Sequence, residues 1–501
     1  MGFSRSSGVL LHISSLPGPH GSGDFGPAAY HFVDWLCTAG QGLWQVLPLG
    51  GIGAGHSPYM SSSAFAGNVL FIDLAELAEH GWLDPKDLEP SASFTPDRVP
   101  FAEVIAYRTE RLEAAARRFA AGAKSADRED FEAFCDSHSG WLPDYALFMA
   151  LAEHFEGQNW TAWDSGLARR RPEALAAARE THRARIFFWT FCQWSFFRQW
   201  RRLKAYANAR AVQIIGDLPI FIAHQSAEVW AHPELFELDG TGKPTVVAGV
   251  PPDAFSATGQ RWGNPLYRWS AHAADGYAWW IERMRRIVEM VDIVRIDHFR
   301  GFEAYWEIPA EEATAERGRW VPAPGDDLFA AVTRVLGPLP VIAEDLGVIT
   351  AEVEALRRKH GFPGMRILQF AFGEFDADRR FLPHNFEPDT VVFPGTHDND
   401  TALGWWHHAP PHVRAHLRAY LATDASEIGW DLIRAACASV AATAIYPLQD
   451  ILGLGSLDRM NLPGTAVGNW SWRFTWDEVR PEHARRLAAL CRLYERGPHR
   501  P

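Results

Sequence analysis

Cysteine is scarce in this sequence and shows no pairing pattern. The 501 residues include five cysteines, an odd number, and no two of them form a CxxC motif. Disulfide-stabilised domains and zinc ribbons both need closely spaced cysteines. We therefore expect reduced thiols in a protein of the cytoplasm.

An excess of positive charge and a long apolar segment are also missing. The formal net charge is −13 at pH 7, the wrong sign to attract nucleic acid or an anionic membrane surface. No apolar run reaches the ~18 residues that a membrane-spanning helix needs. The opening "MGFSRSSGVL" lacks the hydrophobic core of a signal peptide. These absences predict cytoplasmic localisation, with no nucleic-acid or membrane partner.

Short runs of apolar, β-branched residues recur along the chain and end in polar or small residues. They cover residues 8–16, 42–49, 213–221, 292–299, 341–347, 365–370, 390–400 and 442–452. Helical patterns such as "YAWWIERMRRIVEMV" separate the later runs, which is typical of parallel strands joined by crossover helices. An open doubly wound sheet and a closed barrel both fit. Eight units with polar strand ends favour an α/β fold of the (β/α)8 TIM-barrel type, whose active site lies at the C-terminal strand ends.

One interval between these runs is much longer than the others. Residues 76–205 are rich in Ala, Arg and Glu and carry helical patterns such as "RPEALAAARETHRARIFFW". We expect a mainly helical insertion between barrel strands 2 and 3. Because one barrel domain with insertions can exceed about 400 residues, residues 1–501 are expected to form a single catalytic domain.

The run "DIVRIDHFRG" carries charges inside an otherwise β-branched strand. Alternation of side chains along a strand places Ile293, Arg295 and Asp297 on one face. A buried charge is costly unless it is paired or used. The strand therefore admits two interpretations: an Arg295–Asp297 ion pair that only fixes strand register, or a functional carboxylate kept ionised by its neighbour.

Carboxylates stand at the ends of three predicted strands. They are Asp297 in "RIDHFRG", Glu344 in "AEDLG" and Asp398 in "GTHDND". In a barrel these acids converge on one pocket. Retaining glycoside chemistry needs one carboxylate as nucleophile and another as general acid, about 5 Å apart, whereas three acids can also hold Mg²⁺. Arg295 on the face of Asp297 suits a nucleophile better than a metal ligand, so sugar chemistry is favoured.

A series of motifs extends through nearly the whole chain. In order, they are "LLHISSLPGPHGSGDFG", "WQVLPL", "SPYMSSSAFAGN", "GDLPIF", "RIDHFRG", "AEDLG", "GFPGMRILQFAF", "GTHDND" and "QDILGLGSLDRMNLPGTAVGNWSWR". Together they resemble the 4-α-glucanotransferases, also called amylomaltases or disproportionating enzymes, of glycoside hydrolase family 77 in the α-amylase clan. The resemblance implies a (β/α)8 barrel with helical insertions and no separate C-terminal β-domain.

The resemblance also implies roles for individual residues. Asp297 matches the nucleophile, Glu344 the general acid/base, and Asp398 the acid that grips substrate hydroxyls and stabilises the transition state. The implied substrate-binding residues are Tyr59, Asp217, Asp253, Gln260, Trp262, Arg295, His298, His397 and Asn469. Residues 240–270 look like the family's flexible active-site loop.

Two stretches depart from the family's pattern. "FAFGEF" has Gly373 where an acidic residue is expected, although Glu374 follows it. "FIAHQSAEVW" has His224 and Gln225 where a small residue or an acid is expected. Neither departure changes one of the three acids. We therefore expect the departures to affect which sugars the subsites prefer and not the reaction that the acids catalyse. For Tyr59, ordinary packing is an alternative to substrate contact.

The resemblance implies transfer of α-1,4-glucan segments from a donor to the 4-hydroxyl of an acceptor glucan or glucose. The expected partners are maltooligosaccharides and other α-1,4-glucans, and no metal or organic cofactor is expected. Two alternatives stay open on the residues alone: an α-glucan hydrolase with the same acids and a Mg²⁺-dependent barrel lyase. A non-catalytic glucan-binding barrel is disfavoured, because binding alone gives no reason to keep three convergent carboxylates beside Arg295. The resemblance, and not the residues, favours transferase over hydrolase.

Overall fold

A parallel sheet forms the centre of the molecule. The computed structural model describes residues 4–252, 256–373 and 376–498. Within these ranges eight parallel strands form one sheet in the order β10-β11-β12-β1-β2-β3-β6-β9. The strands are β1 (Ser6–Leu10), β2 (Leu43–Gln45), β3 (Gln213–Pro219), β6 (Ile293–Asp297), β9 (Val341–Ala343), β10 (Gly364–Ile367), β11 (Thr390–Phe393) and β12 (Thr443–Pro447). Each overlaps one of the eight predicted runs, and the predicted (β/α)8 barrel is confirmed.

The sheet closes into a barrel between its two outer strands, β9 and β10. No ladder joins these strands in the described ranges, but the amide of Ala343 donates to the carbonyl of Pro363 at 2.9 Å. The amide of Met365 donates to the carboxylate of Asp345 at 2.6 Å. Because the paired strands are parallel, their carboxyl ends meet at one mouth of the barrel.

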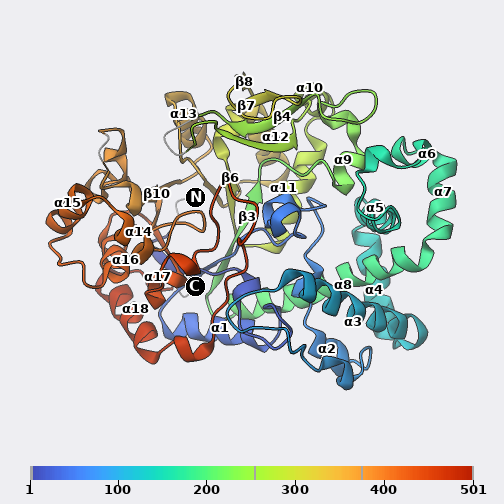
Figure 1. The fold of residues 1–501 in the computed structure, drawn as a ribbon, viewed down its shortest axis with the longest axis horizontal. Helices are drawn as coiled ribbons and strands as arrows, with labels where there is room; N and C mark the ends of the chain where they lie inside the picture. The colour runs from blue at the N-terminus through green and yellow to red at the C-terminus, as the bar shows by residue number, and fades with distance from the viewer. Residues whose placement is uncertain (1–3, 253–255, 374–375, 499–501) are drawn as a thin grey trace.

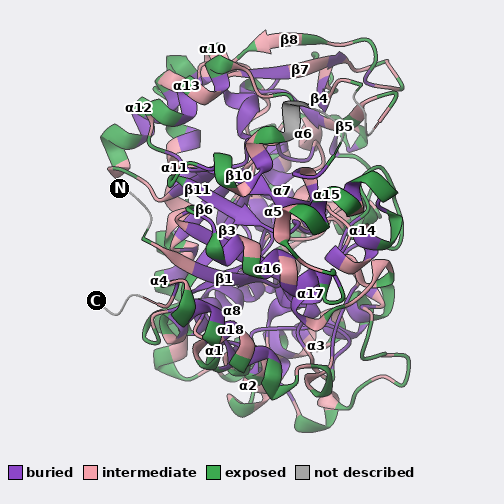
Figure 2. Ribbon diagram, turned by 90° about the vertical axis from the view of Figure 1, so that its left-hand side faces the viewer, coloured by how far each residue is buried: buried purple, intermediate pink, exposed green. Residues whose placement is uncertain are grey.

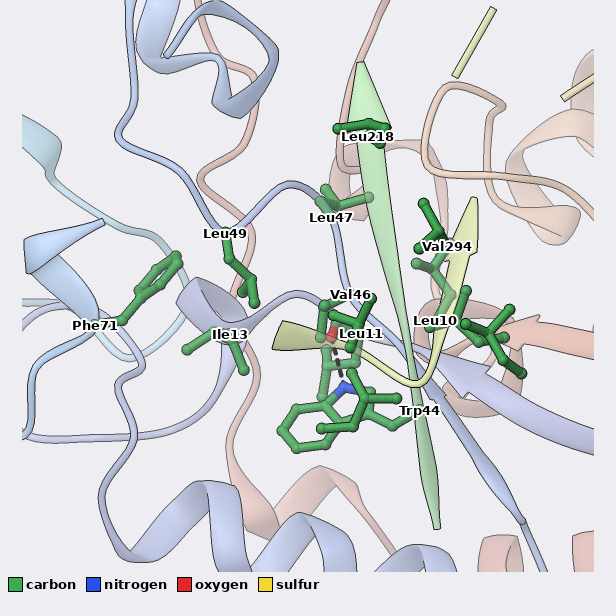
Figure 3. Packing of buried hydrophobic residues seen from close by; sticks show 14 of the residues in the cluster. Leu10, Leu11, Ile13, Trp44, Val46, Leu47, Leu49, Phe71, Leu218 and Val294 are labelled. Carbon is green, nitrogen blue, oxygen red and sulfur yellow. Dashed lines mark hydrogen bonds between the residues drawn. The ribbon is translucent and has the colours of Figure 1, made fainter. Parts of the chain in front are cut away.

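Apolar side chains of adjacent strands pack together and hold the sheet. Figure 3 shows Leu10 of β1, Trp44 of β2, Leu218 of β3 and Val294 of β6 among these residues. Trp44 is fully buried, and its indole N–H donates to the carbonyl of Leu11 at 2.8 Å. Strands of a parallel barrel are covered on both faces, which explains their nearly continuous apolar sequences. The result is a tightly packed frame beneath the polar strand ends.

The chain between β2 and β3 is mainly helical and lies on one side of the barrel (Figure 1). Its helices are α2 (Leu74–Glu79), α3 (Phe101–Gly122), α4 (Ser125–Ser137), α5 (Leu142–His154), α6 (Ser165–Ala168), α7 (Pro172–Thr181) and α8 (Arg183–Asn208). The long helix α8 buries Trp194 and Trp200 and leads directly into β3. No helix in the described part of the chain is both long and apolar enough to cross a membrane.

The remaining helices lie around the barrel, most of them with one face buried and one exposed (Figure 2). They are α1 (Pro27–Thr38), α9 (Ala227–Ala231), α10 (Trp269–Ala274), α11 (Ala278–Met290), α12 (Gly325–Leu336), α13 (Ala351–Lys359), α14 (Ala402–His408), α15 (Pro411–Leu421), α16 (Ile428–Ala438), α17 (Leu448–Leu452) and α18 (Pro481–Leu493). In α11 the buried residues Trp280, Arg283 and Met284 recur one helical turn apart. Among the described residues, no strand follows β12.

A second, antiparallel sheet has the order β5-β4-β7-β8. Its strands are β4 (Val246–Val250), β5 (Gln260–Pro265), β7 (Ala304–Pro309) and β8 (Arg319–Pro322). The segment 240–270, which the sequence suggests is a loop, therefore contains two strands. The polar sequence of β5, with Gly263 at φ +83° and a terminal proline, does not read as a strand by itself. Its pairing with β4 supplies the missing stabilisation.

Candidate active site

Arg295 links two strands at the mouth of the barrel. It lies opposite Asp217 in the β3–β6 pair, and its Nη1 contacts both Asp217 oxygens at 2.6 and 2.8 Å. Its Nη2 lies 2.9 Å from Oδ1 of Asp297, the last residue of β6. Burial opposes the guanidinium charge, but the two carboxylates hold the pKa of Arg295 well above its usual value. The side chain of Asp297, 28% exposed, is thus fixed by a permanent cation while it faces the open mouth.

Tyr59 joins this ion pair to the loop that follows β11. It lies in the short 3-10 helix η3 (Pro58–Met60), and its hydroxyl donates to Oδ2 of Asp217 at 2.8 Å. The same hydroxyl lies 2.9 Å from Nε2 of His397, and the two rings stack with centroids 5.4 Å apart. Nε2 of His397 is also 3.3 Å from Oδ2 of Asp398. Tyr59 therefore does more than pack: its hydroxyl connects strand β3 with the loop carrying His397.

Glu344 is the buried acid of the site. It directly follows β9, and its two carboxyl oxygens accept hydrogen bonds from the amides of His298 at 2.7 Å and Leu346 at 2.8 Å. Burial, followed by the negative charge of Asp297, raises the pKa of Glu344 to about 8. Most Glu344 side chains are therefore protonated at pH 7. A carboxyl group that keeps its proton at neutral pH can act as a general acid.

Trp262 of β5 connects the second sheet with His298, the residue that follows Asp297. The ring of Trp262 meets the ring of His298 edge-on, with centroids 4.9 Å apart, and its indole donates to Oε1 of Gln260 at 3.1 Å. Burial lowers the pKa of His298 to about 4, so its imidazole is uncharged at pH 7. The residues Asp253 and Glu374 lie outside the described ranges.

The loop after α17 supplies residues that the sequence did not single out. The side-chain amide of Asn461 donates to Oδ1 of Asp398 at 2.6 Å, and Arg459 donates to the Asp398 carbonyl at 2.8 Å. Asn469 instead bonds within its own loop, where its Oδ1 accepts from the amide of Leu462 at 2.9 Å. Asn461 and Arg459 both stand in the quoted motif "DRMNLPG", which was the available signal for them.

The departures His224 and Gln225 bind neighbouring chain segments. Oε1 of Gln225 accepts from the amide of Trp160 at 3.0 Å, and Nε2 of His224 lies 2.8 Å from the carbonyl of Gly242. The first contact attaches the loop after β3 to the helical segment between β2 and β3, and the second attaches it to the chain that leads into β4. The other contacts of the two residues, to Asn159, Trp160 and Gln158, lie in the same helical segment.

Comparison with known proteins identifies the family. Residues 11–478 match the family model described as 4-alpha-glucanotransferase. The chain is 51% identical over 500 residues to the 4-alpha-glucanotransferase of Thermus thermophilus, covering 98% of this chain and 99% of the relative. It is 50% identical over 496 residues to that of Synechocystis sp., covering 98% of each.

A solved structure agrees with this relationship over the whole fold. The amylomaltase from Streptococcus agalactiae, in complex with acarbose, superimposes with a TM-score of 0.95 at 40% identity, covering 98% of this chain and 100% of that one. The amylomaltase from Corynebacterium glutamicum shares the fold at 19% identity, with a TM-score of 0.78. The chain therefore belongs to the 4-alpha-glucanotransferase family, glycoside hydrolase family 77, and has the glucanotransferase activity of that family.

Proposed function

We propose that glucan transfer in this protein runs by a retaining double displacement with Asp297 as nucleophile and Glu344 as general acid and base. The observation that carries the proposal is the contrast between the two carboxyl groups. Asp297 is held beside the buried cation of Arg295, whereas Glu344 has a pKa raised to about 8 by burial and by Asp297. Two carboxyl groups whose environments differ in this way suit opposite proton states and so opposite roles.

In the first step a linear α-1,4-glucan lies across the barrel mouth. The Asp297 carboxylate attacks the anomeric carbon while the glycosidic C–O bond breaks. The proton of Glu344 passes to the departing oxygen, so the reducing-end fragment leaves with a free 4-hydroxyl. The product is a covalent β-glucosyl ester on Asp297, and Glu344 is left as a carboxylate.

In the second step the 4-hydroxyl of an acceptor glucan or glucose replaces the departed fragment. Glu344 takes the hydroxyl proton, the acceptor oxygen attacks the anomeric carbon, and the bond to Asp297 breaks. The anomeric carbon inverts twice, so the new linkage is α, and both carboxyl groups return to their starting proton states. Asp398, which His397 and Asn461 hold, grips substrate hydroxyls during both steps.

The substrate-binding set that we propose includes residues from both sheets and the connecting loops. Its members are Tyr59, Asp217, Asp253, Gln260, Trp262, Arg295, His298, His397 and Asn469. Maltooligosaccharides and other cytoplasmic α-1,4-glucans are the donors, and residues 1–501 act as one catalytic domain into which residues 76–205 are inserted. Transfer requires that a bound acceptor outcompete water at about 55 M, an advantage that positioning can supply. The aromatic face of Trp262 beside His298 is a suitable acceptor platform.

Incubation of chelator-treated enzyme with pure maltotriose tests this proposal. The expected products are glucose and a growing ladder of maltooligosaccharides longer than maltotriose, resolved by size over time. Products limited to glucose and maltose would show that water takes the glucosyl group and that the hydrolase alternative is right. Activity that disappears with the chelator and returns with Mg²⁺ would contradict a mechanism based on the three acids alone.

A further inference from the structure

Asp345 occupies the seam at which β9 and β10 close the barrel. Its Oδ1 accepts the hydrogen bond from the amide of Met365 at 2.6 Å. Its Oδ2 lies 3.3 Å from Nη1 of Arg366 and 3.5 Å from Nε of Arg357. The side chain of Asp345 is only 3% exposed, so these contacts are shielded from water. The short hydrogen bond to Met365 is the closest of them. At this seam the Asp345 side chain adds a second connection to the backbone hydrogen bond between Ala343 and Pro363, where the other strand pairs of the barrel have a ladder.

Gly364, the first residue of β10, has no Cβ atom and so leaves space for this carboxylate. A Cβ atom on Gly364 would lie 2.3 Å from Oδ2 of Asp345. Carbon and oxygen cannot approach so closely, and both neighbours are fixed by backbone and ion-pair contacts. The Asp345 carboxylate therefore fits against β10 only because residue 364 has no side chain. We call this contact of Asp345 with Gly364 and Met365 the Asp345 seam contact.

The Asp345 seam contact is adjacent in the chain to Glu344. Asp345 stands between Glu344 and Leu346, whose amide holds Oε1 of Glu344 at 2.8 Å. The amide of His298, at the end of β6, holds the other oxygen at 2.7 Å. Any movement of the turn 344–346 against the rest of the barrel displaces one of these donors. Fixing Asp345 to β10 therefore fixes the direction in which Glu344 points.

We propose that Asp345 is a positioning residue for Glu344: it closes the barrel seam and thereby aims the proton of the acid at the departing glycosidic oxygen. The inference rests on the general-acid role of Glu344 proposed above. Asp345 touches no reacting atom in this scheme. Its contribution is to the geometry of proton transfer and not to the attack by Asp297.

The test compares donors whose leaving groups differ in their need for a proton. Maltotriose needs protonation of its leaving oxygen, whereas the fluoride of α-maltotriosyl fluoride departs without it. Asp345→Ala is expected to lower kcat/KM for maltotriose on the order of 10²-fold, the loss typical of a ~1 Å displacement at a reacting centre. The same variant is expected to change kcat/KM for the fluoride by only a few-fold. Equal losses on both donors would overturn the inference.

Two variants guard against a general loss of folding. Asp345→Asn keeps an oxygen for the amide of Met365 and is expected to recover part of the activity on maltotriose; it also serves if the alanine variant does not fold. Asp292→Ala removes a similar strand-to-strand contact at the other end of the barrel, where Oδ2 of Asp292 accepts from the amide of Ile214 at 2.7 Å. This control is expected to affect both donors equally. A leaving-group preference in Asp292→Ala as large as in Asp345→Ala would overturn the inference.

Glu344→Gln, measured in parallel, separates this inference from the function on which it rests. If Glu344→Gln loses activity on maltotriose and the fluoride equally, the general-acid assignment itself is wrong. If Glu344→Gln discriminates between the donors and Asp345→Ala does not, only the positioning role is overturned. Gly364→Ala gives an independent check, because the clash that it creates requires the carboxylate. Its effect is expected to be large in the native chain and small in the Asp345→Ala background.

Discussion

Arg295 and Asp297, two residues apart on β6, form an ion pair of 2.9 Å at the mouth of the barrel. The structural and the functional interpretations of this strand are compatible. Arg295 also binds Asp217 on the neighbouring strand, so the pair helps to fix strand register. The same cation holds the partly exposed carboxylate that we propose as the nucleophile.

Asp297→Asn is expected to leave the fold intact and to reduce turnover by several orders of magnitude, as loss of a nucleophile does in other enzymes. The fold survives because Arg295 retains Asp217, and the amide oxygen of the new side chain still faces the guanidinium. Circular dichroism and thermal unfolding check the first expectation, and kcat with maltotriose the second. Asp292→Asn is the matched control. A folded variant with substantial residual turnover would refute the nucleophile assignment.

The pKa of Glu344 predicts how kcat/KM for maltotriose changes at alkaline pH. The first step of the proposed mechanism needs protonated Glu344, whose pKa burial and the charge of Asp297 raise to about 8. We expect kcat/KM for maltotriose to fall as pH rises through about 8, while kcat/KM for α-maltotriosyl fluoride falls much less. A maltotriose profile that stays flat to pH 9.5 would contradict the assignment of Glu344 as the acid.

The same raised pKa has a consequence for stability. Between pH values near 4.5 and 8 the folded state keeps the Glu344 proton that the unfolded chain releases, so Glu344 lowers the free energy of unfolding as pH rises through this window. Glu344→Gln removes this contribution. The variant is therefore expected to gain more in Tm over the native chain at pH 9 than at pH 5. An equal difference at both pH values would mean that burial does not destabilise the carboxylate.

Tyr59→Phe tests the connection between the Arg295 network and the loop carrying His397. The substitution removes a hydroxyl that donates to a buried carboxylate and leaves Asp217 without that partner. Asp217 keeps its contacts with Arg295, so the variant loses one hydrogen bond to a charged group, which contributes about 1.5–3 kcal/mol. We expect a comparable loss in transition-state stabilisation, measured as kcat/KM for maltotriose. Tyr206→Phe removes a hydroxyl that donates to the exposed Asp34, and is expected to leave kcat/KM unchanged. Equal activity of both variants would leave the Tyr59 hydroxyl without a role in transfer.

The sequence predicted the barrel because its strands carry their own signals. Each is a short apolar run with a polar end, and parallel strands buried on both faces need little help from distant residues to be recognised. The second sheet was missed for the opposite reason. Strand β5 carries Gly263 and Pro265 among polar residues, and only its partner β4 makes it a strand.

The same distinction separates the acids from the residues that hold them. Asp297, Glu344 and Asp398 could be selected from the sequence because each stands in a motif where the resemblance implies a catalytic acid. Asn461 and Asp345 could not be selected in this way, because their importance comes from contacts with residues distant in the chain. Asn461, for example, is separated from its partner Asp398 by 63 positions. The glycine at 364 likewise has meaning only beside the carboxylate of Asp345.

Asn461 is expected to control how Asp398 faces the substrate. Its amide donates to Oδ1 of Asp398 at 2.6 Å, and His397 lies near the other oxygen, so the carboxylate is held from both sides although its side chain is 44% exposed. A hydrogen bond to a charged group contributes about 1.5–3 kcal/mol. Asn461→Ala is therefore expected to lower kcat/KM for maltotriose by about one to two orders of magnitude, since each 1.4 kcal/mol corresponds to tenfold.

Asn461→Asp sharpens this prediction because it replaces the donor with a second carboxylate. Repulsion turns Asp398 away, so this nearly isosteric change is expected to be at least as harmful as Asn461→Ala. Asn208→Ala is the matched control: Asn208 also donates to an aspartate, Asp292 at 2.8 Å, but at the far end of the barrel, and its loss is expected to leave kcat/KM unchanged. If Asn461→Asp retained native kcat/KM, the orientation of Asp398 would not depend on this hydrogen bond.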